Sequence, residues 1–484
     1  MKSGARLIRR RPPWLIALGA ALGAPLIAAP PVLGHALEGR SYNSPLPLAV
    51  YLLGAAIAVG LSFAFVLLRD IRAERPAASE GGSLPPAWLR TLLRVLGLVA
   101  WIWMAAQGAI GGGFGDGDVV ALFLWVYGWV GLAILSAFVG PVWHWLDPFA
   151  TLHDIGAWLI RTLGIGGWDR APYPARLGRW PAVAGLAFFV WLELAAGQGI
   201  GRPLFIVLVG YTALTLAMMA QFGRDEWRAN GETFSVWFGL LNRLAPLTLV
   251  DPDGRVRRRR FASGLLERGW SVEDLVLVAL GAGSILFDGL SQTEIWFNAF
   301  GAPGVERLTL QLAVFMLVVV GAVLLVGRYV GIAATAAGVL PIAVGYLVGH
   351  YLTFLLIEGQ WIIVAVSDPL RTGQDLFGTA RFEPTGDFLP PVLVWAAQLI
   401  AVAGGHMLGA WAGHVVTRLE DRAAGGTGES RELRLRQVPL AVIMVALTTV
   451  TLWSLGQELV RDPGTEDAAA RVAPPAAALE IVAR

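Results

Sequence analysis

Three ionisable side chains lie a few residues inside the ends of long apolar runs. They are Glu193, Asp288 and His350. At 1.5 Å per residue they are predicted roughly 6, 3 and 12 Å from the ends of their helices. Ionisable groups in apolar spans are costly, and they commonly line a cavity or an ion pathway. Two carboxylates and an imidazole can hold a metal, activate water or relay protons. We therefore take these three as the candidate catalytic residues. Wetting by solvent at the membrane surface is the alternative.

Two further histidines are predicted deeper in one helix. His406 lies about 15 residues into its run, roughly 22 Å from the same boundary, and His414 lies nearer the opposite end. They are candidates for extending a relay inward, although a helix-packing hydrogen bond is the simpler interpretation of His406. The two are eight residues apart on one helix and cannot ligate a single iron, so we expect no haem.

Residues 1–36 have the pattern of a secretory signal. A basic start is followed by the apolar stretch WLIALGAALGAPLIAA. Two cleavage sites fit the pattern, one after Gly34 and one after Ala36. Cleavage after Gly34 would leave His35 as the new N-terminus, where its amine and imidazole could chelate a metal. His35 and His350 are thus the candidate ligands of one divalent metal, and the cofactor is otherwise undetermined. An uncleaved anchor helix is the alternative.

The segment 359–390 is long for a connection between spans. Its apolar stretch WIIVAV is too short to cross a bilayer, so we expect it to fold back as a lid over the site. Gln360 and Asp368 would then lie above the three candidate residues. Asp368 precedes a proline, and turn formation explains it equally well.

The composition requires a membrane protein. The chain has 484 residues, of which 56% are hydrophobic and 15% charged, and it contains no cysteine. This predicts an all-α transmembrane bundle over residues 37–460, with a disordered tail at 461–484. Runs of roughly 20 apolar residues mark the spans. Ten are predicted after the signal, at 46–68, 93–113, 118–139, 180–197, 203–222, 272–290, 308–327, 338–358, 391–416 and 437–457.

Arginine sets the expected orientation. The loops on one side of the ten spans carry 24 arginines, and those on the other side carry five. The positive-inside rule then places the processed N-terminus and the C-terminus outside the bacterial plasma (inner) membrane. We expect the lipid bilayer as the main partner, and no nucleic acid.

The eighth and ninth predicted spans carry small residues at every fourth position. In a bilayer, helices associate by close packing rather than by the hydrophobic effect, so these stripes predict a tightly packed pair. The small residues are Pro341, Gly345 and Gly349 in one span, and Ala401, Gly405, Gly409 and Gly413 in the other.

Two loops on the arginine-rich side contain apolar segments with tryptophan. They are residues 140–163 and 231–247, which we expect to lie in the membrane interface as amphipathic helices. A fold back into the bundle is the alternative. His144 and His153 belong to the first segment and are interpreted as part of its amphipathic surface.

Three stretches resemble a known group of proteins. HALEGRSYNSPLPLAVYL, WFGLLNRLAPL and LPIAVGYLVGHYLTFLLIEGQWIIVAVSDP are similar to bacterial polytopic proteins labelled fenitrothion hydrolase-like. The resemblance implies a membrane-bound hydrolase of organophosphorus triesters that works with a second membrane subunit. It transfers no catalytic residue. A transporter of small solutes, protons or metal, and a non-catalytic subunit of a complex, remain the alternatives.

Overall fold

The computed structural model describes residues 81–111, 118–164, 170–196, 201–301, 304–428 and 431–455. The predicted signal, the first predicted span and the C-terminal tail lie outside these residues. The described part is almost entirely helical, apart from the strands β1 (Leu247–Leu249) and β2 (Val256–Arg258), which pair antiparallel. The predicted all-α polytopic bundle is therefore confirmed.

The described residues contain nine helical segments that are long and apolar enough to cross a membrane. They match the second to the tenth of the predicted spans. The helices that form them are α3 (Ala87–Ile110), α4 (Val119–Ala121) with η2 (Leu122–Leu132) and α5 (Ala133–Phe138), η3 (Ala175–Leu177) with α8 (Trp180–Leu194), α9 (Gly201–Phe222), α12 (Val272–Ser291), α14 (Val305–Val330), α15 (Ile332–Glu358) with α16 (Trp361–Ser367), α17 (Pro391–Ala423), and α18 (Arg431–Arg436) with α19 (Val438–Leu455).

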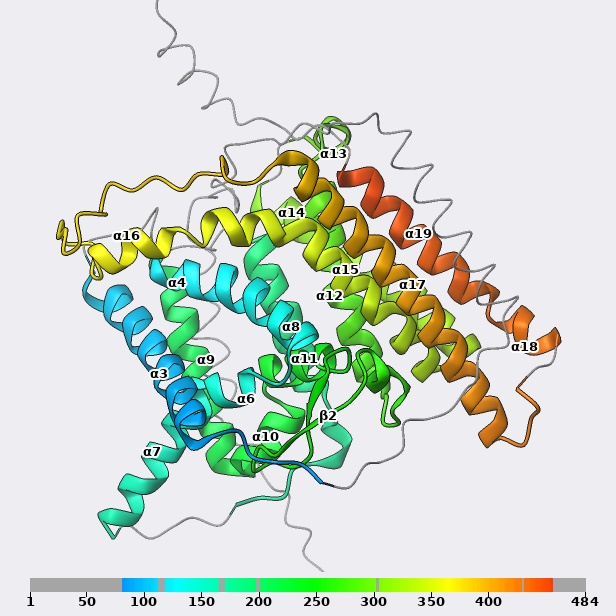
Figure 1. Ribbon diagram of the computed structural model, residues 1–484, viewed down its shortest axis with the longest axis horizontal. Coiled ribbons are helices and arrows are strands. Elements are labelled where there is room, and N and C mark those ends of the chain that lie inside the picture. The colour runs from blue at the N-terminus through cyan, green and yellow to red at the C-terminus, as the bar shows by residue number, and fades with distance from the viewer. Residues whose placement is uncertain are drawn as a thin grey trace, which may run out of the picture.

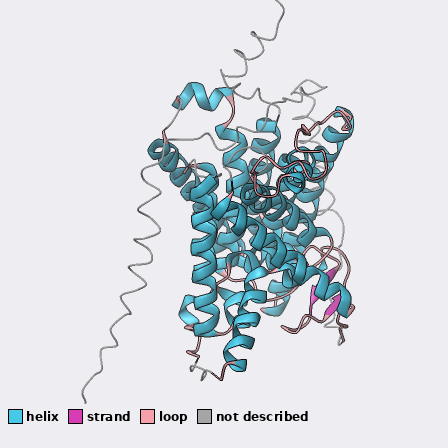
Figure 2. Ribbon diagram, turned by 90° about the vertical axis from the view of Figure 1, so that its left-hand side faces the viewer, coloured by secondary structure: helices cyan, strands magenta, loops and turns pink. Residues whose placement is uncertain are grey.

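Short helices lie at both ends of the bundle (Figures 1 and 2). One end, where α12 and α15 finish, carries α13 (Glu294–Phe300) and α16, and we call it the Asp288 end. The opposite end carries the β1–β2 hairpin, and we call it the hairpin end. The remaining short helices lie at or near the hairpin end; they are α6 (Trp143–Leu146), α7 (Pro148–Thr162), α10 (Arg224–Asn230), α11 (Thr233–Leu241) and η4 (Ser263–Leu266).

The helices α12 and α15 form the centre of the bundle. Nearly every residue of α12 is buried, whereas α3 is exposed along most of its length. Helix α14 presents an apolar outer face that includes Leu310, Leu317 and Leu325. In water such a face would cost free energy, so these helices suit a lipid environment.

The backbones of α15 and α17 touch along the predicted stripe of small residues (Figure 1). A Cβ on Gly405 would collide with the carbonyl oxygen of Pro341, and one on Gly345 would collide with that of Ala401. A Cβ on Gly409 would meet the carbonyl of Gly338. We call these contacts the glycine seam. They confirm the predicted packing at these positions, because only glycine lets the carbonyls approach so closely.

The second of the two predicted interfacial segments lies inside the bundle. Trp237, Phe238 and Leu241 of α11 are buried, and the Trp237 ring fills the space left open by Gly281 of α12. The prediction of an interfacial helix was wrong here because α11 is apolar on all sides, and such a helix is stable only when surrounded. In contrast, α7 exposes Trp158 and Leu159.

The glycine seam predicts a stability difference between adjacent glycines. Gly405→Ala should destabilise the protein by roughly 1–3 kcal/mol, since the added methyl group meets backbone that cannot move aside. Gly404→Ala is the matched control, because nothing lies within 4 Å of its added Cβ. Thermal unfolding in detergent measures both. Equal melting temperatures for the two variants would contradict the close approach.

Candidate functional site

A carboxylate, an imidazole and a phenol meet at the Asp288 end. His350 Nε2 lies 2.9 Å from Asp288 Oδ2, and the Tyr351 hydroxyl donates a 2.7 Å hydrogen bond to the same oxygen. Gln292 Nε2 donates to the other oxygen, Oδ1, at 2.8 Å. A buried carboxylate needs such donors to offset the loss of water. We call these four residues the Asp288 cluster.

The sequence brings these groups together through two helices. Asp288 and Gln292 are one turn apart on α12, so their side chains share a face. His350 and Tyr351 are neighbours on α15, which packs against α12 at Gly289. The Asp288 side chain is 2% exposed and that of His350 is 21% exposed. The carboxylate is therefore enclosed, while the imidazole remains within reach of a small molecule.

Glu193 belongs to the same region. It lies in the last turn of α8, its side chain is buried, and its carboxyl group interacts electrostatically with that of Asp288. The three predicted catalytic residues therefore come from α8, α12 and α15 and gather at one end of the bundle. They do not lie on separate lipid-facing surfaces.

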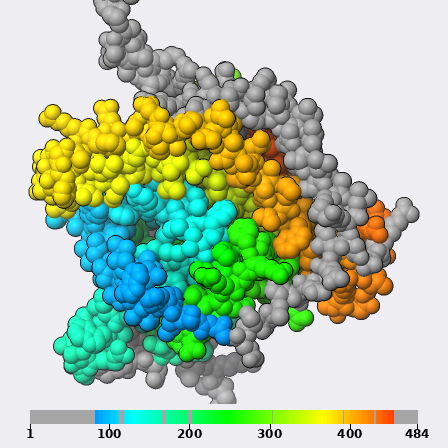
Figure 3. Space-filling view, viewed as in Figure 1, coloured from blue at the N-terminus to red at the C-terminus, as the bar shows by residue number. Residues whose placement is uncertain are grey.

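The part of the 359–390 segment around Asp368 lies elsewhere than predicted. Helix α16 runs across to α3, where Trp103 Nε1 donates to the carbonyl of Pro369 at 2.8 Å (Figure 3). Asp368 accepts hydrogen bonds from the backbone amides of Thr372 and Gly373, which is turn formation. The predicted place of Asp368 above the catalytic residues is corrected, because the contact of Trp103 with Pro369 ties this part of the loop to α3.

Gln360 fastens the same loop to the end of α15. Its amide donates to the carbonyl of Thr385 at 2.9 Å and accepts from the amide of that residue at 3.3 Å. Gln360 therefore connects the loop at Thr385 to the end of α15. Glu358, two residues before Gln360, is buried and accepts a hydrogen bond from Trp361 Nε1.

The deeper histidines bind residues of the last span and its approach. His406 Nδ1 lies 3.0 Å from the Thr448 hydroxyl of α19, and His414 Nδ1 lies 2.8 Å from Gln437 Oε1. Both histidines are buried. The contact of His406 agrees with the predicted helix-packing hydrogen bond beside the glycine seam.

Metal binding stays a prediction. His35 lies outside the described residues, so the structure does not test whether His35 and His350 bind one metal. Among the residues that the structure describes, no group of three or more histidine, aspartate or glutamate side chains gathers as a metal site would require.

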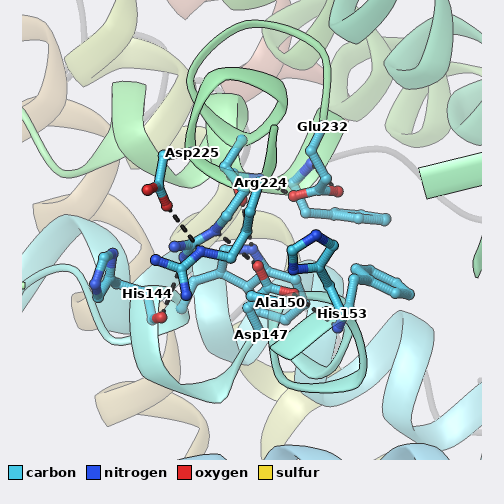
Figure 4. A network of polar contacts seen from close by, with 12 residues as sticks. His144, Asp147, Ala150, His153, Arg224, Asp225 and Glu232 are labelled. Carbon is cyan, nitrogen blue, oxygen red and sulfur yellow. Dashed lines mark hydrogen bonds and ion pairs between the residues drawn. The ribbon is translucent and has the colours of Figure 1, made fainter. Parts of the chain in front are cut away.

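Sequence reasoning missed a second polar cluster, at the hairpin end (Figure 4). The Asp147 carboxylate accepts hydrogen bonds from the first amides of α7 and lies 2.9 Å from Arg228 Nε. Glu232 caps α11 in the same way and accepts a 2.5 Å hydrogen bond from the Tyr211 hydroxyl. Both acids are buried. A local sequence pattern could have indicated both acids, since each immediately precedes a helix, where a carboxylate caps the free amides.

The same cluster extends outward through Asp154, which contacts Arg224 at 2.8 Å and His153 at 3.5 Å. Burial raises the pKa of Asp147 to about 6, against the effect of the Arg228 guanidinium and two backbone amides. Burial, aided by nearby arginines, lowers the pKa of His144 to about 3. The prediction that His144 and His153 are surface residues is corrected, because both pack into this cluster.

The fold and the site define a polytopic helical membrane protein with a largely buried acid–base cluster at one end. No protein-family model matches the chain, and no curated protein matches it significantly.

His144 predicts acid sensitivity at the hairpin end. The pKa of His144 is lower in the folded protein than in the unfolded chain. The unfolded chain therefore binds a proton first as the pH falls below 6.5, and the folded state loses stability until the pH reaches about 3. The loss is at most roughly 1.4 kcal/mol per pH unit. The melting temperature of His144→Gln minus that of the natural protein should therefore be more positive at pH 4.5 than at pH 7.5.

Comparing the two proteins at each pH isolates this effect from Asp147. The raised pKa of Asp147 acts in the opposite direction, because it favours the folded state as the pH falls through about 6. A melting-temperature difference that stays constant from pH 7.5 to pH 4.5 would show that His144 does not titrate in this way.

Proposed function

We propose that this protein is a membrane-bound hydrolase of lipophilic esters, with the Asp288–His350 pair as its general base. The supporting observation is the 2.9 Å contact between Asp288 Oδ2 and His350 Nε2. In the tautomer whose Nε2–H donates a hydrogen bond to the carboxylate, Nδ1 carries the lone pair that could accept a proton from water. A carboxylate that orients a histidine in this way is a recurrent arrangement in hydrolysis.

The proposed step needs only water and the ester. As His350 Nδ1 takes one proton from water, the water oxygen forms a bond to the phosphorus or acyl carbon. The bond to the leaving oxygen breaks, and the leaving group or solvent receives the proton from His350. Asp288 stabilises the imidazolium that forms in between. Tyr351 and Gln292 hold the Asp288 carboxylate in place.

The substrate class follows from the surroundings. A site enclosed by membrane-spanning helices is best reached by a molecule that partitions into lipid. The resemblance to proteins labelled fenitrothion hydrolase-like favours an organophosphorus triester and a second membrane subunit. The excess of arginine at the hairpin side supports a bacterial inner-membrane protein whose Asp288 end faces outward, with both termini on that side.

Transport of a small solute, a proton or a metal is the second candidate. The contacts of His406 with Thr448 and of His414 with Gln437 favour it, since they place polar groups progressively further from the Asp288 cluster. Intramembrane histidines commonly mark ion or proton pathways.

Ester hydrolysis in lipid nanodiscs tests the first candidate. The substrate is a p-nitrophenyl phosphotriester, and release of nitrophenolate is followed by absorbance. Asp288→Asn and His350→Ala should each lower kcat/KM by roughly 10²–10⁴-fold, since each removes the general base or its orienting group. Asp253→Asn changes an exposed acid at the hairpin end and is the matched control.

Retention of full activity by both Asp288→Asn and His350→Ala would exclude the pair as the base. Loss of activity in the Asp253→Asn control as well would show that the assay reports folding rather than chemistry. The melting temperature of each variant separates these outcomes.

A further inference from the structure

The last helix carries three buried hydroxyl groups on one stripe. Thr448, Thr451 and Ser454 follow one another at three-residue spacing on α19, and all three are buried. Residues three apart on a helix are surface neighbours, so the three hydroxyls form a row. Thr449, the neighbour of Thr448, is exposed instead. We call Thr448, Thr451 and Ser454 the hydroxyl row.

One end of the row meets the Asp288 cluster. Gly289 lies directly after Asp288, and its missing side chain leaves space that both Ser454 and His350 face. Ser454 Oγ lies 3.3 Å and His350 Nδ1 lies 3.8 Å from the position that a Gly289 Cβ would take. The nitrogen of His350 that does not contact Asp288 thus borders the same space as the Ser454 hydroxyl, which donates a 2.8 Å hydrogen bond to the carbonyl of Thr451.

Tyr346 completes the middle of this path. It lies one turn from His350 on α15, is fully buried, and its hydroxyl interacts with those of Thr448 and Thr451. Within the described residues, neither the Tyr346 hydroxyl nor that of Thr451 makes a direct hydrogen bond of normal geometry. Buried hydroxyls left in this way generally bind ordered water, which would join them into one chain.

The other end of the row meets the deeper histidines. Thr448 Oγ1 lies 3.0 Å from His406 Nδ1. From there α17 leads inward for eight residues, roughly 12 Å, to His414, which contacts Gln437 at the start of α19. Polar groups therefore follow one another from the Asp288 cluster to His406. The seven residues between His406 and His414 carry no hydroxyl or charged group.

We propose that the hydroxyl row, with Tyr346 and His406, conducts protons between the Asp288 cluster and His406, and that water carries them onward to His414. Each hydroxyl or water accepts a proton on one side and releases its own on the other, so one proton moves and no bond between heavy atoms changes. Titratable groups in membrane spans commonly serve such relays. The path runs through α15, α17 and α19 and does not depend on the ester hydrolysis proposed above.

Proton flux into proteoliposomes tests this path. The vesicles hold a pH-sensitive dye, and a potassium gradient with valinomycin supplies the driving potential. The natural protein should acidify the lumen faster than protein-free vesicles do. Tyr346→Phe and Thr448→Val should each reduce the flux at least tenfold, since each removes one hydroxyl of the chain.

Thr449→Val is the matched control, because it makes the same change at the exposed neighbouring residue, and its flux should equal that of the natural protein. Thr448→Ser retains a hydroxyl and should restore conduction, which separates a lost proton carrier from a misfolded protein. Unchanged flux in both Tyr346→Phe and Thr448→Val, or no flux above protein-free vesicles for the natural protein, would overturn the proposal.

The ester assay on the same samples keeps the two proposals apart. Tyr346→Phe and Thr448→Val leave the Asp288–His350 pair intact, so hydrolysis should continue when conduction is lost. Hydrolysis that is absent in every sample, together with flux that depends on Tyr346 and Thr448, would leave the proton path standing and remove only the hydrolase.

Discussion

The contact between the backbones of α15 and α17 is the constraint on which the rest of this structure depends. Lipid offers no hydrophobic gain for pairing two apolar helices, so the association must come from close packing. Gly345, Gly405 and Gly409 provide it by letting carbonyl groups approach where any side chain would collide. With one face of α15 fixed in this way, its other faces meet α12 and α19. That placement brings His350 to Asp288 and Tyr346 to the hydroxyls of the last helix.

The two polar clusters contain the same kinds of interaction but differ in the role that these interactions favour. At the hairpin end, Asp147 and Glu232 are fully enclosed and spend their hydrogen-bonding capacity on helix amides and on Arg228 or Tyr211. Such groups hold short helices in place. At the Asp288 end, the carboxylate is enclosed but its histidine partner is partly exposed. A buried carboxylate beside a partly exposed imidazole favours a catalytic role over a purely structural one.

His350 joins the two proposals made for this protein. Its Nε2 contacts Asp288, while its Nδ1 faces the space beside Gly289 that Ser454 also borders. The same nitrogen can therefore take a proton from water or exchange one with the hydroxyl row. Gly289 makes this possible, because a side chain at that position would separate the imidazole from α19. Under the two proposals, a proton removed from water at His350 would have a route inward as well as back to solvent.

The sequence determined the features that depend on local pattern. Long apolar runs predicted the nine spans of the described residues, and the spacing of Gly345, Gly405 and Gly409 predicted a close helix pair, since both rest on helix geometry within one segment. Depth along each helix also indicated that Glu193, Asp288 and His350 would gather at one end. Only the tertiary structure decided the pairing of Asp288 with His350, 62 residues apart, the burial of α11, and the course of α16 toward α3. These depend on how each helix is rotated about its axis, which is set by packing against neighbours distant in the chain.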